Sequence, residues 1–276
     1  MNQIHLGDNL DILPTLDEKS VRLCYIDPPF GTGKRQKLTR IRTHEDEMGA
    51  YVGFGGKRFV VDDTEESPSY DDSFDDFLGF LLPRIEAALP LLTDDGSLMV
   101  HLDYREVHYA KVALDKLLGR DHFINEIIWA YDFGGRSKTF WSRKHDTILW
   151  YVKDPKNYVF NYDEIDRIPY LAPSLVGDEK AARGKTPTDV HWHTIVPTNG
   201  KERLNYPTQK PLGLLNRFIK VHSKPGDTVL DFFAGSGTTG QAAANNGREF
   251  ILIDSSQDAM DVMTKRLSKF KPEIKP

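Results

Sequence analysis

The succession of apolar and polar stretches predicts a sheet whose strands are covered on both faces. Residues 21–26 form an apolar run that ends at Asp27, which is typical of a strand buried within a parallel sheet. Shorter apolar runs predict further strands at residues 4–6, 96–102, 125–129, 147–152, 229–230 and 250–253.

Helical spacing of apolar residues predicts helices between these strands. Apolar residues recur every three or four positions over 77–92, and Pro83 among them predicts a kink or a later start of that helix. Further helices are expected over 104–118, 238–246 and 257–270, with ends at Gly119 and Gly247 and an N-cap at Ser255 or Ser256. Strands that alternate with helices predict an α/β fold with a doubly wound, mostly parallel sheet, in which ligands bind beyond the carboxyl ends of the strands.

Two long segments lack this periodicity. Residues 31–72 contain many glycines and charged residues, which predicts a functional or mobile loop. Residues 155–205 are polar and interrupted by prolines, which predicts an inserted module outside the core. We therefore divide the chain into a first half, 1–154, that carries the loop, an insert, 155–205, and a second half, 206–276, of the same domain.

Length and composition narrow the class of protein. The 276 residues are enough for one α/β core with a small insert. No apolar run approaches the length of a membrane span and the first residues do not resemble a signal peptide, so we expect a cytoplasmic protein with no membrane partner. The single cysteine, Cys24, lies in a predicted strand, which indicates a buried inert thiol rather than a disulfide. No third ligand accompanies His191 and His193, so no metal site is expected.

The distribution of charge leaves a nucleic-acid partner open. The formal net charge is −5, but basic residues gather in two groups and the acidic excess lies elsewhere, at 62–76. Either basic group taken alone is also compatible with an ordinary solvated loop. The two groups are Lys34, Arg35, Lys37, Arg40 and Arg42, and Arg136, Lys138, Arg143 and Lys144.

A glycine-rich turn follows the strand expected at 229–230. Residues 235–240 read G-S-G-T-T-G, and Asp254 ends the next strand. Glycines let a ligand approach the backbone, and a carboxylate one strand away can accept hydrogen bonds from ribose hydroxyls, so the pattern fits an adenosine cofactor. Only one strand and one helix are expected after the turn, whereas a dinucleotide requires the rest of a second nucleotide-binding half. This order disfavours a nicotinamide cofactor.

The other strand end with distinctive chemistry reads D-P-P-F at 27–30. Two prolines fix the backbone and remove two N–H donors, which leaves carbonyl acceptors beside the Asp27 carboxylate and the Phe30 ring. Such a pocket suits an amino group with two hydrogens on a stacked ring, as on a flipped-out base. Because the amine lone pair of adenine is delocalised, these hydrogen bonds would favour a pyramidal nitrogen aimed at a methyl donor, and positioning would do most of the work.

Together, the D-P-P-F and F-A-G-S-G sequences resemble two motifs of the DNA amino-methyltransferases, and their order resembles the circularly permuted β class. Three further elements are similar: Gly7-Asp8, the Y-P-T-Q-K-P sequence at 206–211, and the segment 141–153, which resembles the border of the family's target pocket. The resemblance covers nearly the whole chain except 34–72 and 155–205. It implies a permuted Rossmann-like methyltransferase fold, S-adenosylmethionine as cofactor and double-stranded DNA as substrate, with target recognition in 155–205.

The resemblance also implies roles for single residues. The residues expected to hold and stack the target base are Asp27, Pro28 and Phe30, and Pro29 is expected to shape the turn. Those expected to bind the cofactor are Asp8 at its adenine amino group, Asp254 at its ribose, Thr208 and Lys210 at its methionine carboxylate, and Asp231, Phe233, Ala234, Gly235, Ser236, Gly237, Thr238 and Thr239 along its methionine part. Tyr206 stands where the family usually has histidine, so no role is carried over to it.

The alternatives differ in substrate. Family members that act on cytosine N4 usually have serine where this chain has Asp27, so adenine N6 is favoured and cytosine N4 stays an alternative. Methylation of RNA or of a protein amine, and a binding module of the same fold without turnover, are less favoured hypotheses. A cognate restriction endonuclease and a homodimer are possible partners.

The basic group at 34–42 generates a first test. Because this group directly follows the D-P-P-F turn, we expect its side chains to contact phosphates beside the flipped base. Neutralising Arg35, Lys37 and Arg40 should weaken DNA binding and flatten its dependence on salt, as measured by titration at several salt concentrations. Unchanged affinity with an unchanged salt slope would contradict this role.

Overall fold

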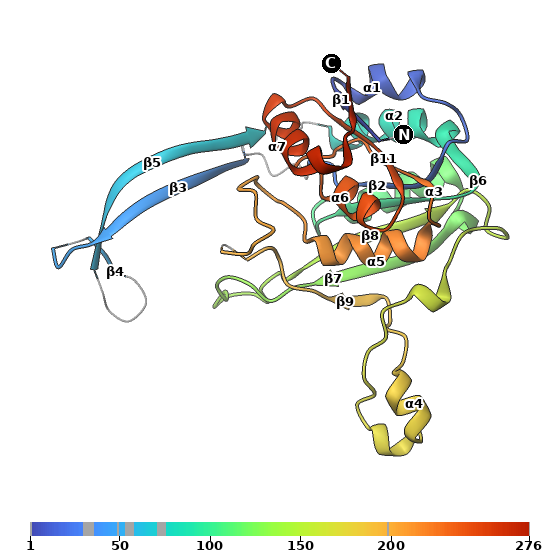
Figure 1. Ribbon diagram of the computed structural model, residues 1–276. Coiled ribbons are helices and arrows are strands. Elements are labelled where there is room, and N and C mark those ends of the chain that lie inside the picture. Colours follow the sequence, from blue (N-terminus) through green and yellow to red (C-terminus); the bar gives the residue numbers. More distant parts are fainter. Residues whose placement is uncertain are drawn as a thin grey trace.

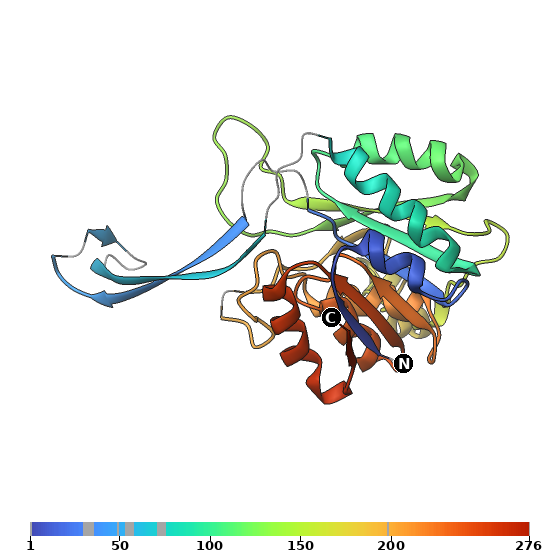
Figure 2. The same cartoon turned by 90° about the horizontal axis from the view of Figure 1, so that it is seen from above.

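The computed structural model describes residues 2–29, 36–48, 50–52, 58–70, 76–197 and 199–275, with only the backbone described at 36–43, 51, 52, 59 and 61–70. An α/β body forms most of the chain, and a long β arm and a smaller helical projection extend from it (Figure 1, Figure 2). In the body, helices cover both faces of one central sheet. The functional chemistry predicted from the sequence lies at one end of this sheet.

The central sheet has nine strands among the described residues. They are β1 (Gln3–Leu6), β2 (Val21–Ile26), β6 (Leu92–Leu102), β7 (Phe123–Ala130), β8 (His145–Val152), β9 (Val190–Trp192), β10 (Thr228–Asp231), β11 (Glu249–Asp254) and β12 (Glu273–Lys275). Their order is β12-β1-β11-β10-β2-β6-β8-β7-β9, and β8 runs antiparallel to both of its neighbours while the other pairs are parallel. The predicted doubly wound, mostly parallel sheet is confirmed.

Two hydrophobic clusters fix which helices cover which face. The side chains of β2 alternate between them, with Leu23 and Tyr25 in one cluster and Cys24 and Ile26 in the other. Three helices pack on the Cys24 face: α1 (Asn9–Ile12), α2 (Phe77–Ala88) and α3 (Val107–Leu118). The opposite face carries α5 (Leu212–His222), α6 (Thr238–Asn245) and α7 (Gln257–Leu267). Short 3-10 turns occur at η1 (Leu13–Thr15), η3 (Leu89–Leu91), η4 (Arg120–His122), η5 (Tyr162–Glu164), η6 (Pro173–Leu175) and η7 (Ser268–Phe270).

The chain winds in opposite directions from the β10–β2 pair at the middle of the sheet. From β2 it crosses through α2 to β6 on one face, and from β10 through α6 to β11 on the other. Connections that diverge in this way open a crevice at the carboxyl ends of the strands between them. Asp27 follows β2 and Asp231 ends β10, so both carboxylates lie at this crevice.

The segment 31–72, expected to be a functional or mobile loop without periodic structure, contains regular β structure in its described part. β3 (Gln36–Glu45), β4 (Tyr51–Val52) and β5 (Arg58–Tyr70) form an antiparallel sheet that extends from the body as an arm (Figure 1). The sequences of these strands mix charged, polar and apolar residues without sustained alternation, so a pattern search does not detect them. Pro68 falls at an irregularity of the β3–β5 ladder, where its missing N–H is tolerated.

The segment 155–205 was expected to be an inserted module outside the core. Its C-terminal part departs from this expectation. β9 adds to the edge of the central sheet, in parallel register with β7. The part of the segment that contains η6 and α4 (Asp178–Arg183) projects from the body (Figure 1), whereas Tyr158 packs against Trp150 and Asn161 donates to carbonyls at the end of α5. After the insert, α5 has no counterpart among the predicted helices, although Leu214, Leu215 and Phe218 are spaced as on one helical face.

The structure also bears on the expectations for Cys24, for the helix at 77–92 and for membrane and metal sites. Cys24 is fully buried, and burial raises the pKa of its thiol, which confirms the inert interpretation. α2 begins at Phe77 and continues through Pro83 rather than starting after it, and Ser256 is the N-cap of α7. In the part of the chain that the structure describes, no helix is long and apolar enough to cross a membrane. The same residues include no group of three potential metal ligands, and His191 packs against Phe218 with ring centroids 5.8 Å apart.

Gly240 in α6 offers a test of the packing between helix and sheet. A Cβ added there would lie 2.6 Å from Cδ1 of Leu252 on β11 and 3.2 Å from Cδ1 of Leu267 on α7. Gly240→Ala should therefore lower the free energy of unfolding by about 1 kcal/mol or more in urea denaturation, despite the better helix propensity of alanine. Gly135→Ala, where an added Cβ meets nothing within 4 Å, is the control. Equal effects of the two substitutions would contradict tight packing at Gly240.

Candidate active site

A cavity of about 310 Å³ lies at the carboxyl ends of β1, β2, β10 and β11. Its volume is at the lower end of the range for small-molecule sites. The predicted site residues that line it are Asp8, Asp27, Pro28, Pro29, Thr208, Lys210, Asp231, Phe233, Ala234, Gly235, Ser236, Thr238, Thr239 and Asp254. Gly237 does not line it, and Phe30 lies outside the described residues. The fold thus brings the D-P-P turn and the glycine turn to one cavity.

The glycine turn depends on backbone conformations that favour glycine. Gly235 and Gly237 have φ angles of 49° and 72°, in the left-handed region. A Cβ on Gly235 would lie 3.2 Å from the ring of Tyr206, and one on Gly237 would lie 2.9 Å from Cγ of Met263 on α7. Gly235 therefore shapes the wall of the cavity, whereas Gly237 allows the turn to pack on α7.

Two buried carboxylates hold this turn. Asp254 accepts hydrogen bonds from the backbone N–H groups of Gly235, at 2.8 Å, and Ser256, at 2.9 Å. Asp231 accepts one from the N–H of Phe233, at 3.0 Å, and one from the hydroxyl of Thr239, at 2.6 Å.

Their burial affects their titration. Burial raises the pKa of Asp254, against the effect of its backbone hydrogen bonds. Burial, with smaller contributions from the nearby Asp27 and Asp254 carboxylates, raises the pKa of Asp231 to about 7, although its hydrogen bonds act in the opposite direction.

Asp27 is held through one of its two carboxylate oxygens. Oδ2 accepts a hydrogen bond from Nζ of Lys210 at 2.5 Å, and the Asp27 side chain is 17% exposed. Oδ1 is buried and has no hydrogen-bond partner among the described residues. Buried acceptors are normally satisfied, so this oxygen at the cavity is an acceptor suited to a ligand that carries N–H groups.

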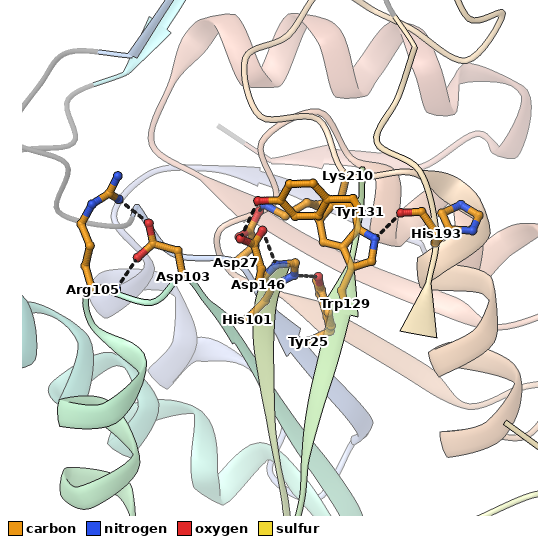
Figure 3. A network of polar contacts seen from close by, with 10 residues as sticks. All are labelled: Tyr25, Asp27, His101, Asp103, Arg105, Trp129, Tyr131, Asp146, His193 and Lys210. Atoms are coloured by element: carbon orange, nitrogen blue, oxygen red, sulfur yellow. Dashed lines mark hydrogen bonds and ion pairs between the residues drawn. The ribbon is translucent and has the colours of Figure 1, made fainter. Parts of the chain in front are cut away.

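A chain of hydrogen bonds lies beside this pair (Figure 3). Nδ1 of His101 is 2.6 Å from the hydroxyl of Tyr25, and its Nε2 is 3.1 Å from Oδ2 of Asp146. Tyr131 donates its hydroxyl to Oδ1 of Asp146 at 3.2 Å. Burial would raise the pKa of Asp146, but interactions with His101, Lys210 and Tyr131 outweigh it and lower the pKa, so this side chain is a carboxylate at neutral pH.

A family model described as DNA methylase matches residues 21–265, which is most of the chain. The chain belongs to this DNA methylase family. It is 32% identical over 289 residues to the type II methyltransferase M.HinfI of Haemophilus influenzae, an alignment covering 99% of this chain and 70% of the relative. It is 31% identical over 274 residues to the DNA adenine methyltransferase YhdJ of Escherichia coli (strain K12), covering 95% of this chain and 81% of the relative. The resemblance noted in the sequence is confirmed.

Solved structures show the same fold. The M1.HpyAVI–SAM complex matches the chain with a TM-score of 0.60 at 23% identity, covering 97% of this chain and 100% of that one. The cytosine-N4-specific PvuII DNA methyltransferase matches with a TM-score of 0.62 at 16% identity, covering 100% of this chain and 95% of that one. At this level of identity the likeness concerns the fold, and the methyltransferase fold predicted for this DNA methylase is confirmed.

The cavity of this DNA methylase is also lined by residues that the sequence analysis did not single out. Asn9 donates to the carbonyl of Phe232 at 2.9 Å, and its buried Oδ1, at the cavity, has no partner among the described residues. Its position directly after Gly7-Asp8 was a usable signal. Arg84 lies over the ring of Phe80 at 3.9 Å and contacts Asp8 at 3.2 Å, which a local pattern in α2 could not reveal.

Arg266 supports the glycine turn from the far end of α7. It donates to the carbonyl of Ser236 at 3.0 Å and to the hydroxyl of Thr238 at 2.8 Å. Burial lowers the pKa of its guanidinium to about 10, so it stays charged at neutral pH. Since α7 has the pattern of an ordinary amphipathic helix, no sequence signal separated Arg266 from the neighbouring Lys265.

The two predicted basic groups lie on different elements. Lys34 and Arg35 lie outside the described residues, and Lys37, Arg40 and Arg42 lie on β3, where only the backbone is described. The register places Arg40 opposite Glu65 and Arg42 opposite Asp63. Part of the acidic stretch at 62–76, which is separate from the basic group in sequence, therefore lies on the strand next to these basic residues. The other group, Arg136, Lys138, Arg143 and Lys144, lies in the loop between β7 and β8.

Asp231 predicts a pH-dependent contribution to stability. Its pKa rises from 3.8 to about 7 on folding, so between these values the folded protein retains a proton that the unfolded chain has lost. This contribution to stability should therefore be lost as the pH rises from about 4 to about 7. Asp231→Asn removes the titration, so urea denaturation across this window should show the variant gaining stability relative to wild type. A difference that does not vary with pH would contradict the assignment.

Proposed function

We propose that this DNA methylase transfers a methyl group from S-adenosylmethionine to N6 of adenine in double-stranded DNA. The observation that carries the proposal is the Asp27 carboxylate, whose Oδ1 is buried, unpartnered among the described residues and placed at the cavity that the glycine turn also lines. A relative at 31% identity is named a DNA adenine methyltransferase, which supports adenine as the base. Aspartate at position 27, rather than serine, agrees with that choice.

The cavity fits the cofactor in several respects. Its wall includes the open backbone of the glycine turn, the Asp254 carboxylate and the unpartnered Oδ1 of Asn9. Oδ1 of Asn9, with Asp8, would accept from the cofactor's adenine amino group, and Asp254 from its ribose hydroxyls. The methionine part would lie along Asp231 and the residues that line the cavity between Phe233 and Thr239.

Lys210 has a second role in this proposal. It was expected at the methionine carboxylate with Thr208, and it pairs with Oδ2 of Asp27 in the structure. An ammonium has three donors and can contact more than one carboxylate, so the two roles are compatible. The pairing fixes Asp27 with Oδ1 available to the base.

The side chains at the cavity would act mainly by position. Oδ1 of Asp27 and the carbonyl of Pro28 would accept the two N6 hydrogens, which favours a pyramidal nitrogen with its lone pair directed toward the cofactor side. When bound, S-adenosylmethionine supplies a sulfonium-bound methyl group whose departure needs no acid. After methyl transfer, N6 carries a positive charge and must lose one proton. Oδ1 of Asp27, which accepts a hydrogen bond from N6 in this proposal, would accept that proton. Tyr131, hydrogen-bonded to Asp146, would wall the base pocket, where Phe30 was expected to stack.

The remaining assignments are proposals of the same kind. The two basic groups would contact phosphates, and residues 155–205 would recognise the target sequence. A cognate restriction endonuclease and a homodimer stay predictions.

The activity can be tested by the identity of the methylated nucleoside. Purified protein is incubated with methyl-labelled S-adenosylmethionine and either unmethylated DNA or RNA, and the nucleic acid is digested to nucleosides and analysed by mass. Labelled N6-methyladenine is the expected product. Labelled N4-methylcytosine would overturn the choice of base, and label in RNA but not in DNA would overturn the choice of substrate.

Asp27 provides the sharpest test of the mechanism. Asp27→Asn removes the charge and one acceptor, so the single-turnover rate of methyl transfer should fall by about 10- to 100-fold or more. Binding of S-adenosylmethionine should stay within about 3-fold of wild type, a change of about 0.6 kcal/mol. Asp121→Asn, at an exposed carboxylate on η4, is the control and should leave the rate unchanged. Full activity of Asp27→Asn would rule out Asp27 as the acceptor.

A further inference from the structure

The loop between β7 and β8 presents large aromatic side chains to solvent. Trp141 is 97% exposed, Phe140 56% and Phe133 51%. Large apolar side chains gathered on one exposed loop mark a contact surface more often than chance exposure does. Neither the cavity nor the central sheet needs these rings, since none of them belongs to either hydrophobic cluster.

The loop is held in shape by contacts within itself. The backbone of Tyr131 pairs with that of Lys144 at 2.9 Å, and the N–H of Ser137 donates to the hydroxyl of Ser142 at 2.8 Å. Lys144 also donates to the carbonyl of Phe133. These bonds join the two sides of the loop, so Trp141 is presented from a braced support, which lowers the entropy lost on binding.

The charge of the loop indicates its partner. Four basic residues and one acid, Asp132, lie between β7 and β8, and Asp132 pairs with Arg136. Arg143 lies 4.2 Å from the ring centroid of Tyr104 and 5.0 Å from that of Phe140, beside the exposed tryptophan. Aromatic rings interleaved with cations match nucleic acid, which offers bases to stack on and phosphates to neutralise.

The loop begins and ends at the expected base pocket. Tyr131 stands at its start and Asp146 after its end, and the two are hydrogen-bonded to each other. Figure 3 shows Asp146 and Tyr131 beside the Asp27–Lys210 pair. Trp141 and Asp146 are five positions apart, so the Cα of Trp141 lies at most ~18 Å from that of Asp146. Trp141 can therefore reach the duplex next to a base that is held at Asp27.

We propose that Trp141 enters the DNA duplex at the position vacated by the target adenine and stacks on the bases left behind. This inference rests on the proposed function. Extruding a base costs the stacking and pairing that held it, and an inserted aromatic ring restores part of the stacking. The inserted Trp141 ring therefore stabilises the extruded state of an adenine that was paired with thymine. An unpaired target adenine needs less of this stabilisation.

The test compares two duplexes that carry the site methylated by the wild-type protein. One pairs the target adenine with thymine, and the other places an abasic site opposite it. For Trp141→Ala, the single-turnover rate should fall about 10-fold or more on the paired duplex and by less than about 3-fold on the abasic duplex. Trp141→Phe should retain most of the wild-type rate on both. Tyr109→Ala is the control, at an exposed aromatic residue on α3, and should change neither rate.

The outcomes separate this inference from the proposed function. If the wild-type protein methylates no adenine in DNA, the proposed function fails. If the wild-type protein methylates adenine in DNA and Trp141→Ala lowers the rate equally on both duplexes, Trp141 contributes to binding or to folding. The proposed insertion of Trp141 into the duplex is then wrong. An unchanged rate of Trp141→Ala on the paired duplex would also overturn the proposed insertion of Trp141. Urea denaturation of each variant shows whether a shared loss arises from destabilisation.

Discussion

Divergence of the chain at the β10–β2 pair is the constraint on which the rest of the molecule depends. Because the crossovers from these two strands pass over opposite faces of the sheet, the described helices lie on those faces, and a crevice forms at the carboxyl ends of the two strands. Residues from both ends of the chain meet at this point. The D-P-P turn after β2 and the glycine turn after β10 are far apart in sequence, yet they share one cavity.

Buried carboxylates give this crevice its chemistry. Asp231 and Asp254 accept hydrogen bonds from the glycine turn, so polar groups that are costly to bury also fix the shape of the turn. Asp27 differs, because Lys210 holds one oxygen and leaves the other for a ligand. Asp146, fixed by His101 and Tyr131, adds a further negative charge beside it. The site therefore combines rigid structural carboxylates with one that is oriented for substrate.

How far the sequence was informative depends on the type of signal. The buried strands and both turns at their ends were predictable, since apolar runs, prolines and glycines constrain the chain locally. Arg266 and Arg84 were not, because their contacts at the cavity connect helices to distant turns. The β arm was missed because its pairing is between backbones and its residues lack an apolar period. The pairing of Lys210 with Asp27 was missed because only the fold brings these positions together.

β1 pairs in parallel register with both β11 and β12, so an early strand lies within the half of the sheet that much later strands build. During synthesis, β1 is made long before β11 and β12. Asp8, which follows β1, therefore precedes the glycine turn that completes the same cavity. A nascent chain can therefore form the D-P-P turn but not the cofactor side of the crevice. The side of the crevice expected to hold the methyl donor can form only when β1 pairs with β11, which lies far along the chain.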